Sequence, residues 1–154
     1  MGEPLGVMRG EPPVVDPVPA LRVVRVTEVA VDLPSQYPTV TLQEDESPER
    51  RVVIPIGMPE GVALAHAWRQ VATPRPLTHE LFAEVLARLG ATIASVRVIG
   101  RRAGIYMAEI DISTPQGVEV VGCRPSDAII MALRQGVPAP LLVDERLFDA
   151  EGDV

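Results

Sequence analysis

The stretch Cys123-Arg124-Pro125-Ser126-Asp127-Ala128-Ile129-Ile130-Met131-Ala132-Leu133 joins a polar beginning to a continuous apolar run. Proline suits the first turn of a helix, where its missing N–H group is no loss. The spacing of Ile129, Ile130 and Leu133 places these three side chains on one helical face. The stretch therefore predicts a helix that begins at Pro125, stops at Gly136 and is buried along one side.

Two other segments share this character, namely Arg75-Pro76-Leu77-Thr78-His79-Glu80-Leu81 and Ile56-Gly57-Met58-Pro59-Glu60-Gly61. Each places a carboxylate within a few residues of a proline, just ahead of an apolar helical run. The Pro59 helix should reach about Gln70, and because it is apolar nearly all round we expect it to be largely buried. The next helix should have Thr78 as its N-cap and should end before Gly90. Its core-facing stripe should be Phe82, Val85, Leu86 and Leu89. On its solvent-exposed face we expect an ion pair between Glu84 and Arg88.

Strands are predicted where apolar residues alternate or cluster: 21–33, 39–43, 51–56, 92–99, 105–113, 118–123 and a short last strand at 141–143. Short turns between them imply antiparallel pairing with the helices on one side, which is the α+β class. Aligning Glu60 with Asp127 also suggests two βββ-type halves, each followed by a helix, so that the fold has three main helices. Residues 1–19 are expected to be a disordered proline-rich arm, 20–150 the domain and 151–154 a frayed tail.

The three proline-containing segments together resemble the bifunctional nuclease domain family, and the resemblance extends over roughly 21–148. The Arg-Pro-Ser-Asp-Ala run at 124–128 is its most specific part. The chain departs from the usual pattern at Pro55, Gly61 and Glu80, where members often carry an aromatic residue, alanine and aspartate. The resemblance implies a nuclease that acts on both DNA and RNA.

Composition excludes several other classes. Apolar residues make up 47% of the 154 residues, yet no run approaches the roughly 18 needed to cross a bilayer. The N-terminus lacks the apolar segment of a secretory signal, and a single cysteine, Cys123, cannot form an internal disulfide, so we expect a cytoplasmic protein. The sequence contains no phosphate-binding P-loop, dinucleotide fingerprint or zinc-ligand spacing. Aromatic residues, at 3%, are too scattered for a stacking-type single-strand binder.

The net charge of −7 argues against a protein that binds nucleic acid over its whole surface. All 14 basic residues are arginine, which is explained by a GC-rich coding bias or, alternatively, by a need for side chains that bind phosphate through two N–H groups. A local positive groove remains compatible with an acidic protein.

The candidate catalytic residues are Glu60, His79, Glu80 and Asp127. Glu60 and Asp127 would hold Mg²⁺ or another divalent metal, and Arg75, Arg124 and Ser126 would bind phosphate. A simpler explanation applies to each acid, because a carboxylate in the first turn of a helix is stabilised by the helix dipole. His79 would act as a general acid or base, or would close its helix end by a hydrogen bond.

Two functions follow. The first is a nuclease that hydrolyses phosphodiester bonds in RNA and DNA with a divalent metal. The second is a non-catalytic homo-oligomeric module that binds a small ligand or a protein. Convergence of at least two of the acids within metal-bridging reach, in a cleft flanked by arginine, would favour the first function. Acids that each face only their own helix end would favour the second.

Overall fold

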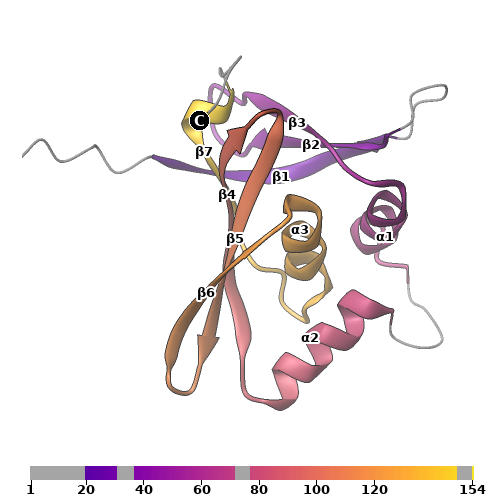
Figure 1. The fold of residues 1–154 in the computed structure, drawn as a ribbon, viewed down its shortest axis with the longest axis vertical. Coiled ribbons are helices and arrows are strands. Elements are labelled where there is room, and N and C mark those ends of the chain that lie inside the picture. Colours follow the sequence, from indigo (N-terminus) through magenta and orange to yellow (C-terminus); the bar gives the residue numbers. More distant parts are fainter. Residues whose placement is uncertain (1–19, 31–36, 72–76, 149–153) are drawn as a thin grey trace, which may run out of the picture.

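A computed structural model describes residues 20–30, 37–71, 77–148 and Val154. The predicted arm at 1–19, most of the predicted tail and the candidate residue Arg75 lie outside these ranges. Within them the chain forms seven strands, three α-helices and one 3-10 turn, which confirms the α+β class (Figure 1).

The strands make one sheet, in the order β3-β2-β1-β7-β4-β5-β6. Their bounds are β1 Leu21–Ala30, β2 Thr39–Glu44, β3 Arg51–Pro55, β4 Thr92–Arg102, β5 Ile105–Thr114, β6 Gly117–Cys123 and β7 Leu141–Asp144. Pairing is antiparallel throughout except between β4 and β7, which run parallel. The 3-10 turn η1, Glu145–Phe148, follows β7.

The short strand β7 lies between two three-stranded meanders, β1-β2-β3 and β4-β5-β6. The side chains of Leu141 and Val143 in β7 are buried. They belong to a core of Val, Ile, Leu and Ala that is continuous across both meanders. A relation by duplication between the two halves stays a prediction, because the sheet order alone does not establish that they superpose.

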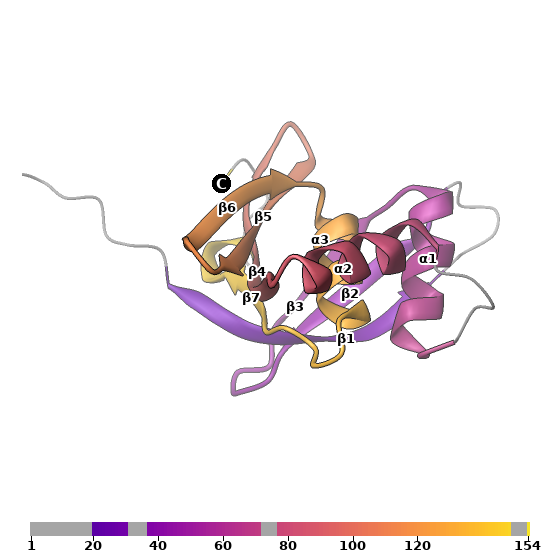
Figure 2. The same ribbon diagram turned by 90° about the horizontal axis from the view of Figure 1, so that it is seen from below.

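The helices gather on one side of the curved sheet, with α3 between α1 and α2 (Figures 1 and 2). They are α1 Met58–Trp68, α2 Thr78–Arg88 and α3 Pro125–Arg134. As the sequence predicts, Ile129 and Ile130 of α3 are buried, each 1% exposed. Among the described residues, no helix has the length and apolar character that a membrane crossing requires.

Two predictions about helix burial are wrong. The helix α1 is buried only along Gly61, Leu64 and Ala67, and Val62 is half exposed, because only one side of α1 meets α3 and the sheet. No residue of α2 is buried, and the predicted core residues Phe82, Val85 and Leu89 are exposed. A helical stripe of apolar side chains predicts which face is apolar, but not whether a neighbour covers that face.

The start of α2 also differs from the prediction. The N-cap residue is Leu77, in an extended conformation and without a side-chain cap, so Thr78 is the first helical residue. The Glu84–Arg88 ion pair on the wet face of α2 is confirmed, with 3.0 Å between Arg88 Nη2 and Glu84 Oε1.

Candidate active site

The start of α3 carries the most connected residue of the site, Arg124. Arg124 is the N-cap of α3, with an extended backbone, and Pro125 follows at the first helical position. Its guanidinium donates from Nε to Asp127 Oδ2 at 2.8 Å and from Nη2 to Asp127 Oδ1 at 3.2 Å. This two-point contact is the geometry that arginine favours with a carboxylate, and it also suits a phosphate.

The same guanidinium reaches the first turn of α1. Arg124 Nη1 donates to Glu60 Oε1 at 2.9 Å, so that one side chain connects two helices. The Glu60 carboxylate folds back over Gly57, where its Oε2 occupies the position that a Cβ on Gly57 would take. A side chain at position 57 would therefore displace Glu60 from Arg124.

The helix α2 contributes His79, which lies in its first turn. His79 Nε2 lies 2.9 Å from Asp127 Oδ1, and both side chains are partly buried, at 22% and 29% exposed. Because an ionised carboxylate only accepts hydrogen bonds, this contact places a proton on Nε2 and leaves Nδ1 as the acceptor of the neutral ring. We refer to Glu60, His79, Arg124 and Asp127 as the Arg124 cluster.

Asp127 is held in its charged form. Burial raises the pKa of Asp127, but hydrogen bonds from Arg124 and His79 outweigh burial, so its pKa lies below the ordinary value. The pKa of Arg124 is raised by its hydrogen bonds to Asp127 and then to Glu60. Asp127 is therefore an ionised partner of Arg124 at neutral pH, and the carboxylates of Asp127 and Glu60 both face the guanidinium.

Glu80, the fourth predicted catalytic residue, faces a different neighbour. Glu80 Oε1 lies 3.4 Å from Arg134 Nη2 at the end of α3, and Arg134 also donates to the backbone oxygen of Val71 at 3.1 Å. Glu80 and Arg134 line a cavity of about 820 Å³ between α2, the beginning of β4 and the 134–140 segment. The structure thus brings Glu60, His79 and Asp127 together and directs Glu80 elsewhere.

A smaller cavity of about 210 Å³ adjoins Arg124. Its walls are the first residues of α3, including Ser126, the end of β3 with Gly57 shortly after it, and the β4–β5 turn at Gly104 with the beginning of β5. Ser126 is 4% exposed, so it lies at the base of this region rather than on the open surface. Sequence reasoning missed the contribution of the β4–β5 turn, because a turn signal does not indicate which distant element the turn approaches.

The donor set does not form a ready metal site. Across the described parts of the chain, no group of three or more His, Cys, Asp or Glu side chains is placed to hold a metal ion. Glu60 and Asp127 approach each other only through the Arg124 guanidinium, a cation that a metal would have to displace.

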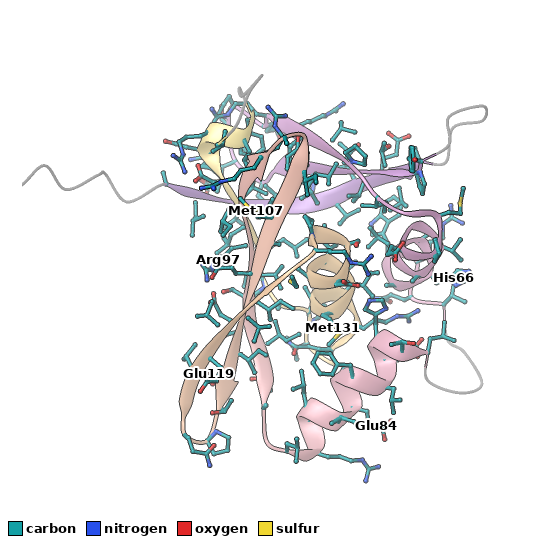
Figure 3. The ribbon with its side chains drawn as sticks, in the orientation of Figure 1. His66, Glu84, Arg97, Met107, Glu119 and Met131 are labelled. Atoms are coloured by element: carbon teal, nitrogen blue, oxygen red, sulfur yellow. The ribbon has the colours of Figure 1, made fainter. Side chains whose placement is uncertain are left out.

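The neighbouring residues are structural. Cys123 is half-buried at the end of β6 and packs against the core. Burial, followed by the nearby charges of Asp127 and Glu109, raises the pKa of its thiol to about 11. The other histidine, His66, lies on α1 outside the cluster (Figure 3), and its buried Nδ1 has no hydrogen-bond partner within the described residues.

Comparison with known families shows which family the chain belongs to. The model of the bifunctional nuclease domain family matches residues 40–153, which include all three proline-containing segments. The chain belongs to the bifunctional nuclease domain family. Its relatives include the uncharacterized proteins MT1877 and Rv1829 from two strains of Mycobacterium tuberculosis, each 35% identical over 129 residues. The matched region covers 84% of this chain and 75% of either relative.

Membership of the bifunctional nuclease domain family confirms the resemblance drawn from the sequence, and the name of the family connects it with nucleic acid. The relatives carry no described activity, so residue roles have to be argued from the geometry of the Arg124 cluster.

Proposed function

We propose that this chain hydrolyses phosphodiester bonds in RNA and DNA at the Arg124 cluster. The observation that carries the proposal is the chain of contacts His79–Asp127–Arg124–Glu60, which joins the first turns of three helices. The family name supports a nucleic-acid substrate. An acidic net charge of −7 makes a local, arginine-centred contact with phosphate more suitable than a broad basic surface.

His79 is assigned the proton transfer. With Nε2 donating to Asp127, its Nδ1 accepts a proton from the attacking water, whose oxygen bonds to phosphorus as the bond to the leaving oxygen breaks. The imidazolium then returns this proton to the leaving oxygen. Asp127 orients the ring and stabilises the imidazolium that forms, and its lowered pKa keeps it ionised for that task. Under this assignment, Asp127 must keep its hydrogen bonds to both His79 and Arg124 at the same time.

Arg124 is assigned the phosphate. Asp127 holds the guanidinium through two N–H groups, whereas Glu60 holds it through one, so the Glu60 contact is the one that a phosphate oxygen would replace. The first turns of α1 and α3 add the partial positive charge of helix N-termini on the same side. Ser126 lines the adjoining cavity and is the next polar group available to a phosphate oxygen. Arg75 remains a proposed phosphate contact, from a segment that the structure does not describe.

The ligand pair Glu60 and Asp127 stays the candidate for Mg²⁺, but as arranged these carboxylates neutralise Arg124, and no step above goes through a metal. For Glu80 we propose a positioning role instead of a catalytic one. Its pairing with Arg134 assigns it to holding α2 against α3, beside the proton-transfer residue, rather than to the reacting atoms.

The test is cleavage of labelled single-stranded RNA and DNA, with Mg²⁺ or with EDTA, measured across the size-exclusion peak. His79→Gln and Arg124→Lys are the informative variants. The first removes the imidazole ring. The second replaces a planar guanidinium, which can donate two N–H groups to one phosphate, by a compact ammonium group. Loss of one charged hydrogen bond corresponds to about 1.5–3 kcal/mol, so Arg124→Lys should lower the cleavage rate by roughly ten- to a hundredfold.

Arg88→Lys is the matched control, because Arg88 is 78% exposed on α2 and lies outside the cluster. Cleavage that follows the protein peak, survives Arg88→Lys and is lost in His79→Gln supports the assignment. Cleavage that is absent from the wild-type protein, or is equal in all variants, contradicts it.

The alternative function is a non-catalytic module that binds a small ligand or protein. The observation that favours it is the mutual neutralisation of Arg124, Glu60 and Asp127, which leaves the cluster ion-paired without any substrate. Absence of cleavage together with intact folding of the wild-type protein would favour this function.

A further inference from the structure

The cavity of about 210 Å³ beside Arg124 has a polar side and an apolar side. The polar side is the start of α3, with Arg124 and Ser126. The apolar side consists of Ile54 and Ile56, at the end of β3 and just after it, and Ile105 at the beginning of β5. A molecule that matches this cavity therefore combines an anionic group with an apolar body.

Ser126 has a hydrogen-bonding group that the protein does not use. The residue is only 4% exposed, and within the described residues no hydrogen bond involves its hydroxyl group. Buried hydroxyl groups ordinarily have a partner. Because Ser126 lines the cavity, a molecule bound there is able to supply the partner.

The turn between β4 and β5 gives the apolar side a fixed shape. Ala103 and Gly104 both have positive φ, at 49° and 77°, as a tight two-residue hairpin turn requires. Ile105 follows the turn, borders the cavity and is 69% exposed. Tyr106, the next residue of this wall, is held by Arg101, whose Nη1 donates to the phenol oxygen at 3.2 Å and whose guanidinium lies 5.5 Å from the ring centroid. The wall is thus formed before any ligand binds.

The size of the cavity limits what it can enclose. Pockets for drug-sized molecules measure about 300–1,000 Å³, so a cavity of about 210 Å³ suits one flat ring system rather than a whole nucleotide. Arg124 lines the cavity and its side chain is 63% exposed, so a phosphate bound to its guanidinium remains open to solvent. The ring and the charge of one nucleotide can therefore be divided between the cavity and Arg124.

We propose that this cavity is a subsite for one unpaired nucleobase, whose phosphate is held by Arg124. The inference rests on the proposed function, because it takes from it the contact between Arg124 and phosphate. The isoleucines contact the faces of the base, and the Ser126 hydroxyl bonds to a polar atom of the same nucleotide. Only one base is enclosed, so the scattered aromatic residues of the chain are no obstacle.

The subsite determines which form of nucleic acid is recognised. A base in a duplex is paired and stacked, and it has to leave the helix before a pocket can enclose it. Unpairing costs free energy that a single strand does not have to supply. The cavity therefore selects single-stranded RNA or DNA over a duplex.

Equilibrium binding tests the subsite separately from cleavage. Fluorescence anisotropy at fixed salt and in EDTA compares two labelled strands of about eight nucleotides, oligothymidylate and a strand of abasic sites with the same number of phosphates. We expect wild type to bind oligothymidylate roughly five- to a hundredfold more tightly, which is the range for contact with one base. His79→Gln, whose substitution lies outside the cavity, is titrated alongside so that cleavage does not consume the labelled strand.

Ile105→Ala removes part of the apolar wall from an exposed position and leaves Arg124 in place. It should reduce the preference for oligothymidylate by at least about threefold and leave the affinity for the abasic strand unchanged. Arg124→Lys should weaken the binding of both strands alike. Val137→Ala is the matched control, because Val137 is 81% exposed and lines the larger cavity instead, and it should change neither affinity.

The outcomes separate the subsite from the proposed hydrolysis. Failure of wild type to bind either strand, equal binding of the two strands, or an undiminished preference in Ile105→Ala overturns the subsite. A preference that falls in Ile105→Ala, in a protein that cleaves nothing, supports the subsite and contradicts the hydrolysis. Cleavage by a protein that binds both strands equally, or that cuts a duplex as fast as a single strand, supports the hydrolysis and overturns the subsite.

Discussion

Glu44 is a carboxylate that is fully buried and surrounded by arginine. It accepts hydrogen bonds from Arg22 Nε at 2.9 Å, from Arg50 Nη2 at 2.9 Å and from the backbone N–H of Arg50 at 2.7 Å. The side-chain hydrogen bond from Arg50 is the main cause that lowers the pKa of Glu44 from 4.5 to about 2, against the opposing effect of burial. Glu44 thereby ties β1 to the β2–β3 turn through charge.

This pKa makes the stability of the protein sensitive to acid. Because the folded-state pKa is depressed, the stabilisation by Glu44 is present above about pH 4.5 and is lost as the pH falls toward 2. We expect Glu44→Gln to melt well below wild type at pH 7, and the gap between the two melting temperatures to shrink below pH 4.5.

Thermal melts at several pH values between 7 and 3 measure that gap. Glu84→Gln is the control, since Glu84 is 46% exposed in a surface ion pair and its replacement should change the melting temperature little. A gap for Glu44→Gln that stays constant down to pH 3 would contradict the assigned pKa.

At the scale of elements, the close approach of α1 to the chain before β2 positions Glu60. A Cβ on Gly61 would meet Pro38 Cγ at 2.5 Å and Cβ at 2.8 Å, and the Pro38 ring is itself buried and rigid. Glycine at this position lets the first turn of α1 lie directly on Pro38. Glu60, the preceding residue, is thereby brought to Arg124.

Gly61→Ala should therefore destabilise the protein by about 1–3 kcal/mol, because overpacking forces the helix to move. It should also reduce any activity of the Arg124 cluster, since Glu60 moves with the helix. Urea unfolding measures the first effect. Gly136→Ala is the matched control: nothing lies within 4 Å of its Cβ position, so a stability equal to or slightly above wild type is expected. An unchanged urea midpoint for Gly61→Ala would show that α1 has room to adjust.

The elements themselves were largely predictable from sequence, and their environment was not. Pro59 and Pro125 correctly mark two helix starts, because proline fixes a backbone angle locally. Burial of Leu89 was predicted wrongly, since it depends on a neighbour that no local pattern specifies. The Arg124–Asp127 contact spans three residues and follows from helix geometry. The His79–Asp127 and Arg124–Glu60 contacts span 48 and 64 residues, so only the tertiary fold reveals them.

For the whole molecule, β7 is the strand on which cooperativity depends. It pairs with β1 on one side and β4 on the other, and so it is the sheet connection between the two meanders. Val143, at its centre, is 0% exposed. Weakening this strand should therefore weaken both meanders together rather than release one of them.

We expect Val143→Ala to lower stability by about 2 kcal/mol while unfolding stays a single transition. Trp68, the single tryptophan, reports on α1, whereas far-ultraviolet circular dichroism reports on the whole chain. Their urea midpoints should coincide in wild type and shift equally in the variant. Separate midpoints would show that the two meanders unfold independently.

The raised pKa of the Cys123 thiol makes this side chain slow to react with oxidants. With a pKa of about 11, its sulfur is a thiolate in on the order of one molecule in ten thousand at pH 7. Oxidants and alkylating agents react with the thiolate, so this side chain stays chemically quiet although part of it reaches solvent. The single thiol of this chain is therefore a poor target for alkylation and for thiol–disulfide exchange.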